Sequence, residues 1–276
     1  KHIANLNARN KSEKLEEFEV IIPVYHKDNA LAYVLIGDLK TDENDSLEEK
    51  LKFIQTITNI VIVAVENKKL FSNQVQQEVL KKELELAAKM QSMLIPGDLP
   101  YDKHVEMASV YLPHHDIGGD YFDTIPVNDD QIAFCVGDIS GKGIAAALLM
   151  ANFQANLRSL IIEHHEDLPK LVEELNDKVA RITKGEKFIT IFLGLYNYET
   201  RQLRYVNAGH NPSLLCCNGQ VKELTQGCTL LGMFDDLPFI NQGEETLPEG
   251  AVLLNYTDGL IDFENEKKEF FSLERV

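Results

Sequence analysis

A long stretch without helix breakers occupies the middle of the sequence and limits what the chain can form. From Leu47 to about Leu94 there is neither Pro nor Gly, and apolar residues recur at helical spacing. Ser46 or Asp45 is placed to cap the start of a helix, and Pro96 is placed to end it. The sequence therefore predicts one long helix that separates a short N-terminal segment from a larger C-terminal portion.

The second half of this helix carries two apolar stripes. The first has heptad spacing and runs through Leu80, Leu84, Ala87, Gln91 and Leu94. The second runs through Val79, Leu86, Met90 and Met93. Two stripes suggest two partners, a dimer mate and the following domain, whereas the alternative is one broad face packed on a single core. We expect a homodimer that forms through this helical linker.

The segments on either side of the helix have the pattern of strands. Before it, residues 18–25 and 31–39 predict a hairpin with a polar turn at 26–29. After Pro100, two helices are expected at residues 144–163 and 168–182 among several short strands. The expected strands are 105–112, 131–138, 188–197, 202–207, 212–217 and 251–257. This order predicts an α+β fold with a largely antiparallel sheet.

Composition excludes several classes of function. The net charge is −17 and the pI is near 4.9, so nucleic-acid binding, which needs clustered Lys and Arg, is not expected. The apolar run at residues 60–65 is too short to span a bilayer. The four cysteines form neither a C-x-x-C pair nor a disulfide framework, which indicates thiols in a reducing compartment. We expect a cytoplasmic location.

Three short motifs each place an Asp beside a glycine where a strand meets a turn. They are centred on Asp120 in residues 117–123, on Asp138 in residues 136–143, and on Asp258 in residues 256–259. Carboxylates held at several strand ends can converge on hard divalent cations, which prefer oxygen ligands. Two such ions would hold a phosphate and activate a water molecule. Each motif alone is weak, because Asp-Gly is also a common turn dipeptide.

Other residues near these motifs have competing interpretations. Residues 137–143 lack the Gly-Lys-Ser/Thr ending of a nucleotide-binding loop. Asp123 is expected to organise its loop by hydrogen bonds rather than bind a metal. Lys142 could contact phosphate or lie in solvent. His210 could reach substrate or support a loop near the metals, but a plain turn between two strands is the favoured alternative.

Taken in order, the motifs from about Met90 onward resemble the SpoIIE/RsbU-type branch of the bacterial metal-dependent protein phosphatases (PPM). The resembling segments are Ala87–Pro96, Gly118–Asp123, Gly137–Gly143, Phe188–Gly194, Asn207–Pro212, Leu230–Gly232 and Tyr256–Gly259. The resemblance implies a sandwich of two antiparallel β-sheets flanked by helices. It also implies a binuclear site with two Mn²⁺ or Mg²⁺ ions.

The resemblance assigns roles to particular residues. Asp138 would bridge the two ions, Asp120 and the backbone carbonyl of Ile139 would hold one ion with it, and Asp258 would hold the other. The implied reaction is hydrolysis of phosphoserine or phosphothreonine by a metal-activated water, with no covalent intermediate. The implied substrate is a phosphorylated protein, namely a STAS-type anti-sigma-factor antagonist.

The remaining expectations concern organisation. Residues 1–66 resemble part of a GAF-like sensor domain, on strand order and on Ile22–Val24 and Ala32–Gly37. Residues 67–95 would form a coiled-coil-like linker that transmits a signal, and residues 96–276 would form the phosphatase domain.

The family carries a further acidic motif near its C-terminus, and the sequence ends at Val276 without it. Asp262, Glu264 and Glu266 are too close to Asp258 to replace that motif. We expect a domain truncated at its C-terminus that binds the second metal weakly and has little activity. Two alternatives stay open, a non-catalytic scaffold with this fold and a sensing fragment whose function lies in the long helix.

Overall fold

The computed structural model describes residues 4–5, 18–26, 29–38, 46–113 and 117–276. The chain divides into two compact units, Lys1–Lys81 and Lys82–Val276, and each is considered separately below.

The N-terminal unit contains a small antiparallel sheet. Its strands are β1 (Ala4–Asn5), β2 (Val20–His26) and β3 (Asn29–Ile36), in the order β1-β2-β3. Val20, Ile22 and Val24 are buried, which is the period-two pattern of a strand with one face on a core. The predicted hairpin is confirmed. The centre of its turn and the end of the second predicted strand, Leu39, lie outside the described residues.

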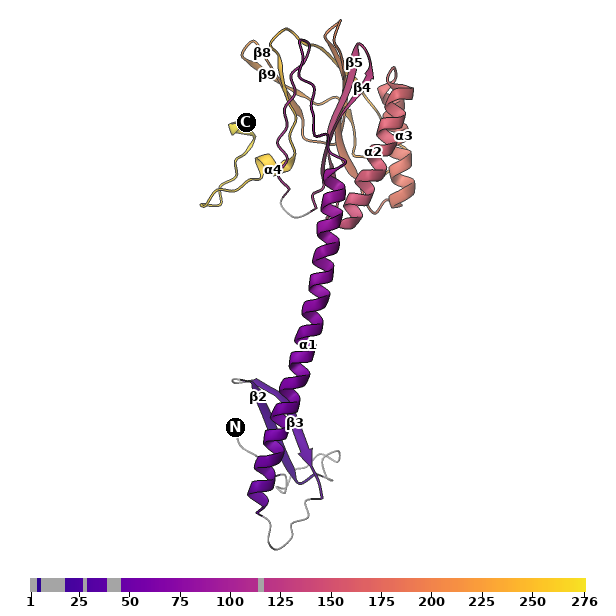
Figure 1. Ribbon diagram of the computed structural model, residues 1–276. Helices are drawn as coiled ribbons and strands as arrows, with labels where there is room; N and C mark the ends of the chain where they lie inside the picture. The colour runs from indigo at the N-terminus through magenta and orange to yellow at the C-terminus, as the bar shows by residue number, and fades with distance from the viewer. Residues whose placement is uncertain (1–3, 6–17, 27–28, 39–45, 114–116) are drawn as a thin grey trace. The chain divides into compact units, whose positions relative to one another are not determined.

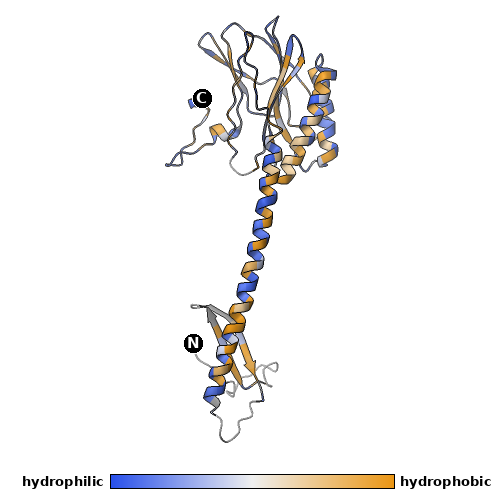
Figure 2. Cartoon of the chain, viewed as in Figure 1, coloured by the Kyte–Doolittle hydropathy of each residue, from blue (hydrophilic) through white to orange (hydrophobic). Residues whose placement is uncertain are grey.

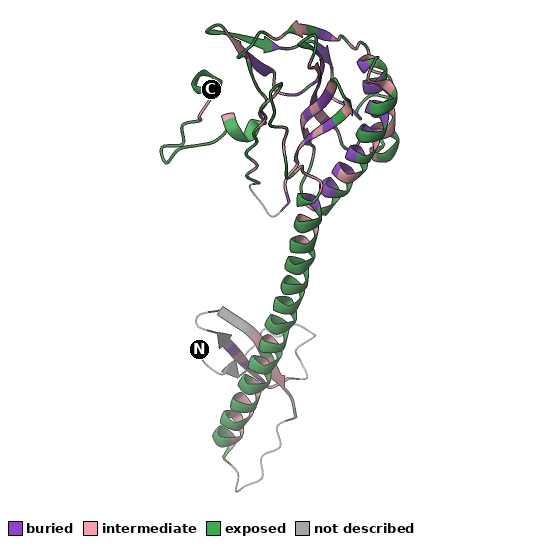
Figure 3. Cartoon of the chain, turned by 45° about the horizontal axis from the view of Figure 1, so that its top comes forward, coloured by how far each residue is buried: buried purple, intermediate pink, exposed green. Residues whose placement is uncertain are grey.

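A single helix, α1 (Leu47–Ser92), follows, as its lack of Pro and Gly predicts. Most of its side chains are exposed between residues 52 and 83 (Figure 3). Apolar and polar residues alternate along this length (Figure 2). The exposed apolar residues include Phe53, Leu70 and Phe71, each more than 60% exposed.

The C-terminal unit is built on a six-stranded sheet. It contains β4 (Asp120–Asn128), β5 (Gln131–Ile139), β6 (Ile189–Asn197), β7 (Gln202–Ala208), β10 (Gly227–Cys228) and β11 (Gly243–Thr246). The strand order is β10-β7-β6-β5-β4, and β11 also pairs with β7. All pairs are antiparallel except β10 with β7.

A three-stranded sheet covers one face of this large sheet (Figure 1). It consists of β8 (Ser213–Cys217), β9 (Gln220–Leu224) and β12 (Val252–Leu254), in the order β12-β8-β9. Phe192 and Tyr205 of the large sheet pack with Leu215 and Leu224 of the small one in a shared buried cluster. The result is a sandwich of two sheets, as expected for the fold class.

Two helices cover the opposite face, α2 (Ile144–His164) and α3 (Leu168–Thr183). They bury a large apolar cluster against alternate residues of β6, which include Ile191, Leu193 and Leu195. Because β6 is covered on both faces, it is apolar almost throughout. Among the described helices, only α2 is long and apolar enough for a membrane span, and half of that stretch is buried. Packing on the sheet accounts for its composition.

Two of the predicted strands differ from the structure. The predicted strand at residues 105–112 is wrong, since this segment has no strand ladder and only Tyr101 and Glu106 form an isolated bridge. Val110 and Leu112 in this segment remain exposed. The strand at 251–257 is shorter than predicted, because the chain leaves the sheet after Leu254 and enters the short helix α4 (Asp258–Ile261). A 3₁₀ turn, η2 (Leu273–Arg275), lies near the end.

Candidate metal centre

Two of the three predicted carboxylates lie opposite each other on one hairpin. Asp120 is the first residue of β4, Asp138 is the penultimate residue of β5, and the two are direct cross-strand partners. A short turn joins the strands at their other end, so the antiparallel register places both residues at the same end of the hairpin. Both side chains are half-buried.

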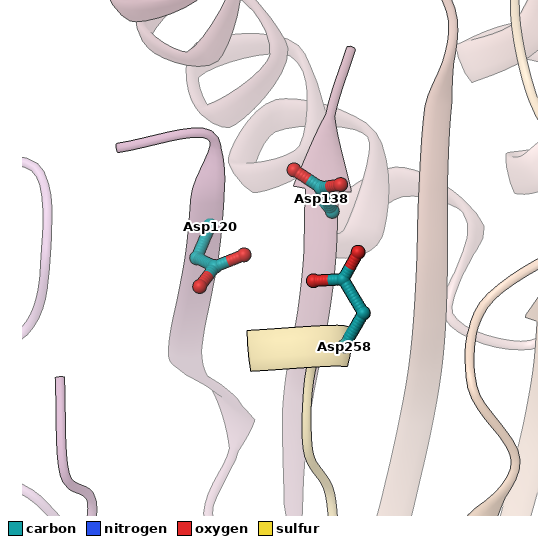
Figure 4. Close-up of side chains that lie close together, drawn as sticks. All are labelled: Asp120, Asp138 and Asp258. Atoms are coloured by element: carbon teal, nitrogen blue, oxygen red, sulfur yellow. The ribbon is translucent and has the colours of Figure 1, made fainter. Parts of the chain in front are cut away.

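The third carboxylate comes from a distant part of the chain. Asp258 begins α4, directly after Thr257, whose hydroxyl donates a hydrogen bond of 3.0 Å to Oδ2 of Asp120. Carboxylate oxygens of Asp120, Asp138 and Asp258 all lie within 4.8 Å of one another. The three side chains point toward a common space (Figure 4). The structure thus brings together the three side chains that the sequence motifs singled out.

The local electrostatics favour a positive ligand. Burial raises the pKa of Asp120, the hydrogen bond from Thr257 acts against this, and the charges of Asp138 and Asp258 add to the rise. Burial also raises the pKa of Asp138, and the charge of Asp258 adds to it, while the backbone of Ile139 acts in the opposite direction. Repulsion between close carboxylates is relieved when a cation is bound between them.

A fourth oxygen and a glycine complete the shape of this site. A Cβ placed on Gly119 would lie 2.6 Å from Oδ1 of Asp138 and 2.8 Å from the carbonyl oxygen of Ile139. Both oxygens therefore face the same point, and only a residue without a side chain leaves them room. The Ile139 N–H donates to the Gly119 carbonyl over 3.1 Å, which fixes the two segments side by side.

These donors fit a divalent cation of the hard class. The set consists of carboxylate and carbonyl oxygens only, as Mg²⁺ and Mn²⁺ prefer. A methyl group on Gly119 would push two of these oxygens out of place. Asp120, Asp138, Asp258 and the Ile139 carbonyl are therefore the candidate ligands.

The end of α1 contacts the backbone beside this cluster. Gln91 is buried, its Nε2 donates to the Gly118 carbonyl over 2.7 Å, and the Gly118 N–H donates to its Oε1 over 3.2 Å. Gly118 precedes the candidate ligand Asp120 by two residues. The heptad pattern placed Gln91 on the first stripe. It gave no sign that Gln91 would both donate to and accept from the backbone of a residue distant in sequence.

Asp123 lies outside the cluster and acts as a structural hub. It is fully buried and forms two hydrogen bonds of 2.8 Å with Arg158 of α2. The Tyr121 hydroxyl and Nε2 of Gln154 also donate to it, over 2.8 and 3.3 Å. Gln154 in turn donates to the carbonyl of Leu94, just beyond α1. Asp123 therefore links β4 to α2. The expected hydrogen-bonding role is confirmed, but Asp123 lies in a strand and binds a helix rather than organising a loop.

The two other candidates have different surroundings. Lys142 is exposed in the loop between β5 and α2. His210 lies in the turn between β7 and β8 but is buried. Burial lowers the pKa of His210 to about 4, and the Tyr256 backbone and the charge of Asp258 partly oppose this. His210 is therefore neutral near pH 7.

Sequence comparisons identify relatives for most of this chain. The sequence model of the family described as Stage II sporulation protein E (SpoIIE) matches residues 128–276, which contain Asp138 and Asp258 and begin shortly after Asp120. Protein IcfG of Synechocystis sp. is 26% identical over 92% of this chain and 44% of its own length. Phosphoserine phosphatase RsbU of Bacillus subtilis is 27% identical over 70% of this chain and 57% of its own length.

The chain thus spans about half the length of the curated relatives it matches. Among solved structures, the SiaA-PP2C domain of Pseudomonas aeruginosa superimposes with a TM-score of 0.58 at 19% identity. The alignment covers 72% of this chain and 80% of that domain, which supports the fold.

Proposed function

The chain belongs to the SpoIIE family, and from this membership we propose that it is a metal-dependent protein phosphatase acting on phosphoserine or phosphothreonine. The observation that carries the proposal is the convergence of Asp120, Asp138 and Asp258 within 4.8 Å. An all-oxygen cluster of this kind suits phosphoester hydrolysis, in which catalysis rests on positioning and on neutralising charge.

Each ligand has a proposed role in holding two ions, Mn²⁺ or Mg²⁺. Asp138 would bridge them, Asp120 and the Ile139 carbonyl would hold the first with it, and Asp258 would hold the second. Such ions supply a Lewis acid for a phosphoester and lower the pKa of water. The protein's own contribution is to fix the donors. The β4–β5 register holds Asp120 opposite Asp138, and the Thr257 hydrogen bond ties the Asp258 segment to Asp120.

The proposed substrate is a phosphorylated bacterial signalling protein, specifically a STAS-type anti-sigma-factor antagonist. Two relatives, RsbU and RsbP of Bacillus subtilis, are named phosphoserine phosphatases, which supports a phosphoserine protein as substrate. The net charge of −17 disfavours a nucleic-acid partner. All four cysteines are free thiols, which supports a cytoplasmic location.

Regulation is proposed to act through α1. In this proposal residues 1–66 are part of a GAF-like sensor, residues 67–95 are the linker, and residues 96–276 are the phosphatase domain. The contact of Gln91 with Gly118 supports a coupling between the end of the linker and the segment that carries Asp120. A signal that shifted α1 would move this backbone and thereby change the geometry of the ligands.

A homodimer through α1 is part of the same proposal. The first stripe, with heptad spacing, partly packs within the C-terminal unit, since Leu94 packs against the core of that unit. The second stripe is left exposed, with Val79, Leu86, Met90 and Met93 between 52% and 78% exposed. An apolar stripe of this kind suits a partner helix.

Mass measurement tests the dimer. Replacing both Leu86 and Met90 with Glu should convert a dimer to a monomer in light scattering. A matched control replaces the exposed Lys82 and Lys89 with Glu. If the parent is a monomer at micromolar concentration, or if the Leu86/Met90 variant stays dimeric, the proposed interface is refuted.

The catalytic proposal is tested with phosphate release from a phosphoserine protein by the full-length protein. Asp138→Asn removes the bridging charge and should lower the Mn²⁺-dependent rate at least about 100-fold, since a ligand of both ions is lost. Asp129→Asn makes the same chemical change at an exposed position in the turn of the same hairpin and should leave the rate unchanged. Equal rates in the parent and Asp138→Asn would refute the proposed metal centre.

A further inference from the structure

Lys187 is an exposed lysine that the proposed chemistry does not use. It stands just before β6, two residues ahead of Ile189. A Cβ placed on Gly141 would lie 2.5 Å from Nζ of Lys187, 3.4 Å from its Cε and 3.7 Å from its Cδ. The end of the lysine side chain therefore lies across Gly141, in the loop that leads from β5 to α2.

The backbone around Lys187 is held on two sides. On one side, the Phe188 N–H donates to the Ser140 hydroxyl over 2.8 Å, and the Ser140 N–H donates to the Phe188 carbonyl over 2.9 Å. On the other side, Ile189 and Leu231 exchange two backbone hydrogen bonds of 2.9 and 2.8 Å. The point from which the lysine side chain extends is therefore fixed relative to the loop that it crosses.

Gly141 lies between the lysine and the candidate metal centre. Its carbonyl oxygen lies 3.7 Å from the point that a Cβ on Gly119 would occupy, which Oδ1 of Asp138 and the Ile139 carbonyl oxygen also approach. Gly141 has a φ of +102°, a conformation that favours glycine, and the lysine occupies the space that a side chain would need. Lys187 is therefore a neighbour of the cluster, separated from the candidate ligands by the Gly141 backbone.

The ammonium group is available to an anion from outside the chain. Within the parts of the chain that the structure describes, Nζ of Lys187 forms neither a hydrogen bond nor an ion pair. The chain carries 44 Asp and Glu against 27 Lys and Arg, so its overall field repels an anionic substrate. A cation next to the cluster opposes this repulsion where the substrate must bind.

The charges of the proposed complex favour one further cation. The carboxylates of Asp120, Asp138 and Asp258 cancel most of the charge of two divalent ions. The ions alone therefore do not balance a phosphoserine, which carries a charge of about −1.5 to −2 near pH 7. Carboxylates next to the phosphoserine in a protein substrate add to this excess of negative charge.

We propose that Lys187 is a substrate-binding residue, whose ammonium group binds an anionic oxygen of the phosphoserine segment. This oxygen belongs either to the phosphoryl group or to a carboxylate beside the phosphoserine, since both offer an ammonium group the same charge-assisted hydrogen bond. The inference rests on the proposed phosphatase function and identifies a residue that recognises the substrate of that reaction.

Steady-state kinetics of the full-length protein with Mn²⁺ test this assignment. The substrates are p-nitrophenyl phosphate, a capped phosphoserine peptide with flanking aspartates, and the same peptide with alanines in place of those aspartates. Lys187→Gln should raise the KM for the aspartate peptide about 3–10-fold and leave kcat within about twofold, because a contact to substrate is lost while the metal donors are unchanged. Lys187→Arg keeps the charge and should stay close to the parent. Lys170→Gln, the same change at an exposed position in the first turn of α3, is the matched control.

The three substrates identify the oxygen that is bound. A KM raised for all three in Lys187→Gln assigns the contact to the phosphoryl group, and a KM raised for the aspartate peptide alone assigns it to a flanking carboxylate. Any other pattern overturns the proposal, including three unchanged KM values or a fall in kcat alone. A rise in KM of the same size in Lys170→Gln also overturns it, since the effect would then belong to net charge.

Two further measurements separate this proposal from its alternatives. The melting temperature and the Mn²⁺ affinity of Lys187→Gln should equal those of the parent, and a loss of either would assign Lys187 to support of the Gly141 loop instead. Failure of the proposed phosphatase function appears in the parent, as a rate no higher than that of Asp138→Asn. In that case the fluorescence anisotropy of the labelled aspartate peptide decides: weaker binding by Lys187→Gln supports the proposal, and binding equal to that of the parent overturns it.

Discussion

Replacement of Gly119 by Ala tests the geometry of the proposed metal ligands, with the stability of the metal-free fold measured alongside. The backbone of Gly119 is outside the left-handed region, so alanine can adopt its conformation. The added Cβ would lie 2.6 Å from Oδ1 of Asp138 and 2.8 Å from the Ile139 carbonyl oxygen. To reach ordinary contact, these oxygens must recede by about 0.6–0.8 Å.

The expected loss follows from the tolerance of metal sites. Ligand distances hold to within about 0.2 Å, so a shift of this size removes or lengthens two donor contacts. Changes of this kind weaken metal binding by about 10–100-fold, or roughly 1.4–2.8 kcal/mol. The metal-free fold should also lose some stability, because one of the two oxygens belongs to the backbone of Ile139 and cannot move aside as freely as the end of a side chain.

The assay is calorimetric titration of the metal-free protein with Mn²⁺, together with thermal unfolding without metal. Gly97→Ala is the matched control, because within the described parts of the chain no atom lies within 4 Å of the place its methyl group would take. The backbone of Gly97 is also compatible with alanine. Mn²⁺ affinity in Gly119→Ala equal to that of Gly97→Ala would refute the reasoning. So would a loss of affinity that is matched by unfolding of the metal-free protein.

Three further predictions concern the surroundings of the cluster. Gln91→Leu removes both hydrogen bonds to Gly118 and should lower the free energy of unfolding of the C-terminal unit by about 2 kcal/mol in urea titrations. Gln91→Glu keeps only the acceptor, so its free energy of unfolding should lie between those of the parent and Gln91→Leu. An equal effect of both variants would contradict this. The pKa of Asp138 is raised in the metal-free fold. Protonated Asp138 therefore contributes stability below pH 3.8, the ordinary pKa of an aspartate, and this contribution is lost as the pH rises through the raised pKa. Metal-free Asp138→Asn should therefore melt at a higher temperature than the parent near pH 7, and this advantage should vanish at about pH 3; no gain near neutral pH would refute it. Asp123→Ala should destabilise the fold by about 2–3 kcal/mol in urea titrations, because the buried Tyr121 hydroxyl loses its acceptor while the half-exposed Arg158 is solvated by water. A urea midpoint equal to that of the parent would contradict this prediction.

The sequence predicted the candidate metal ligands better than it predicted the contacts that hold them in place. Asp120, Asp138 and Asp258 were identifiable because each stands beside a turn glycine at a strand end. Such residues meet when antiparallel strands align their ends. Ile139 was assigned as a candidate ligand only from the resemblance to the phosphatase family, because any residue type can offer a backbone carbonyl.

The supporting contacts were not predictable from local pattern. Gln91 has heptad spacing like its apolar neighbours, and its partner is a backbone group 27 residues away. The strand β4 was recognised as a motif but not as a strand, since Asp120, Asp123 and Pro126 lower its strand propensity. Conversely, residues 105–112 have strand character but no ladder partner, and pairing depends on tertiary structure rather than on propensity.

The different origins of the three carboxylates have a consequence for the order of folding. Asp120 and Asp138 belong to one hairpin, whose closure is local and entropically cheap. Asp258 follows the last strand of the small sheet, so it can join the other two carboxylates only after both sheets have formed. Its contact with Asp120 and Asp138 links residues far apart in sequence, and such contacts form slowly. Tight cation binding would therefore come only after both sheets have formed, and a newly made chain would stay inactive until the Asp258 segment had been incorporated.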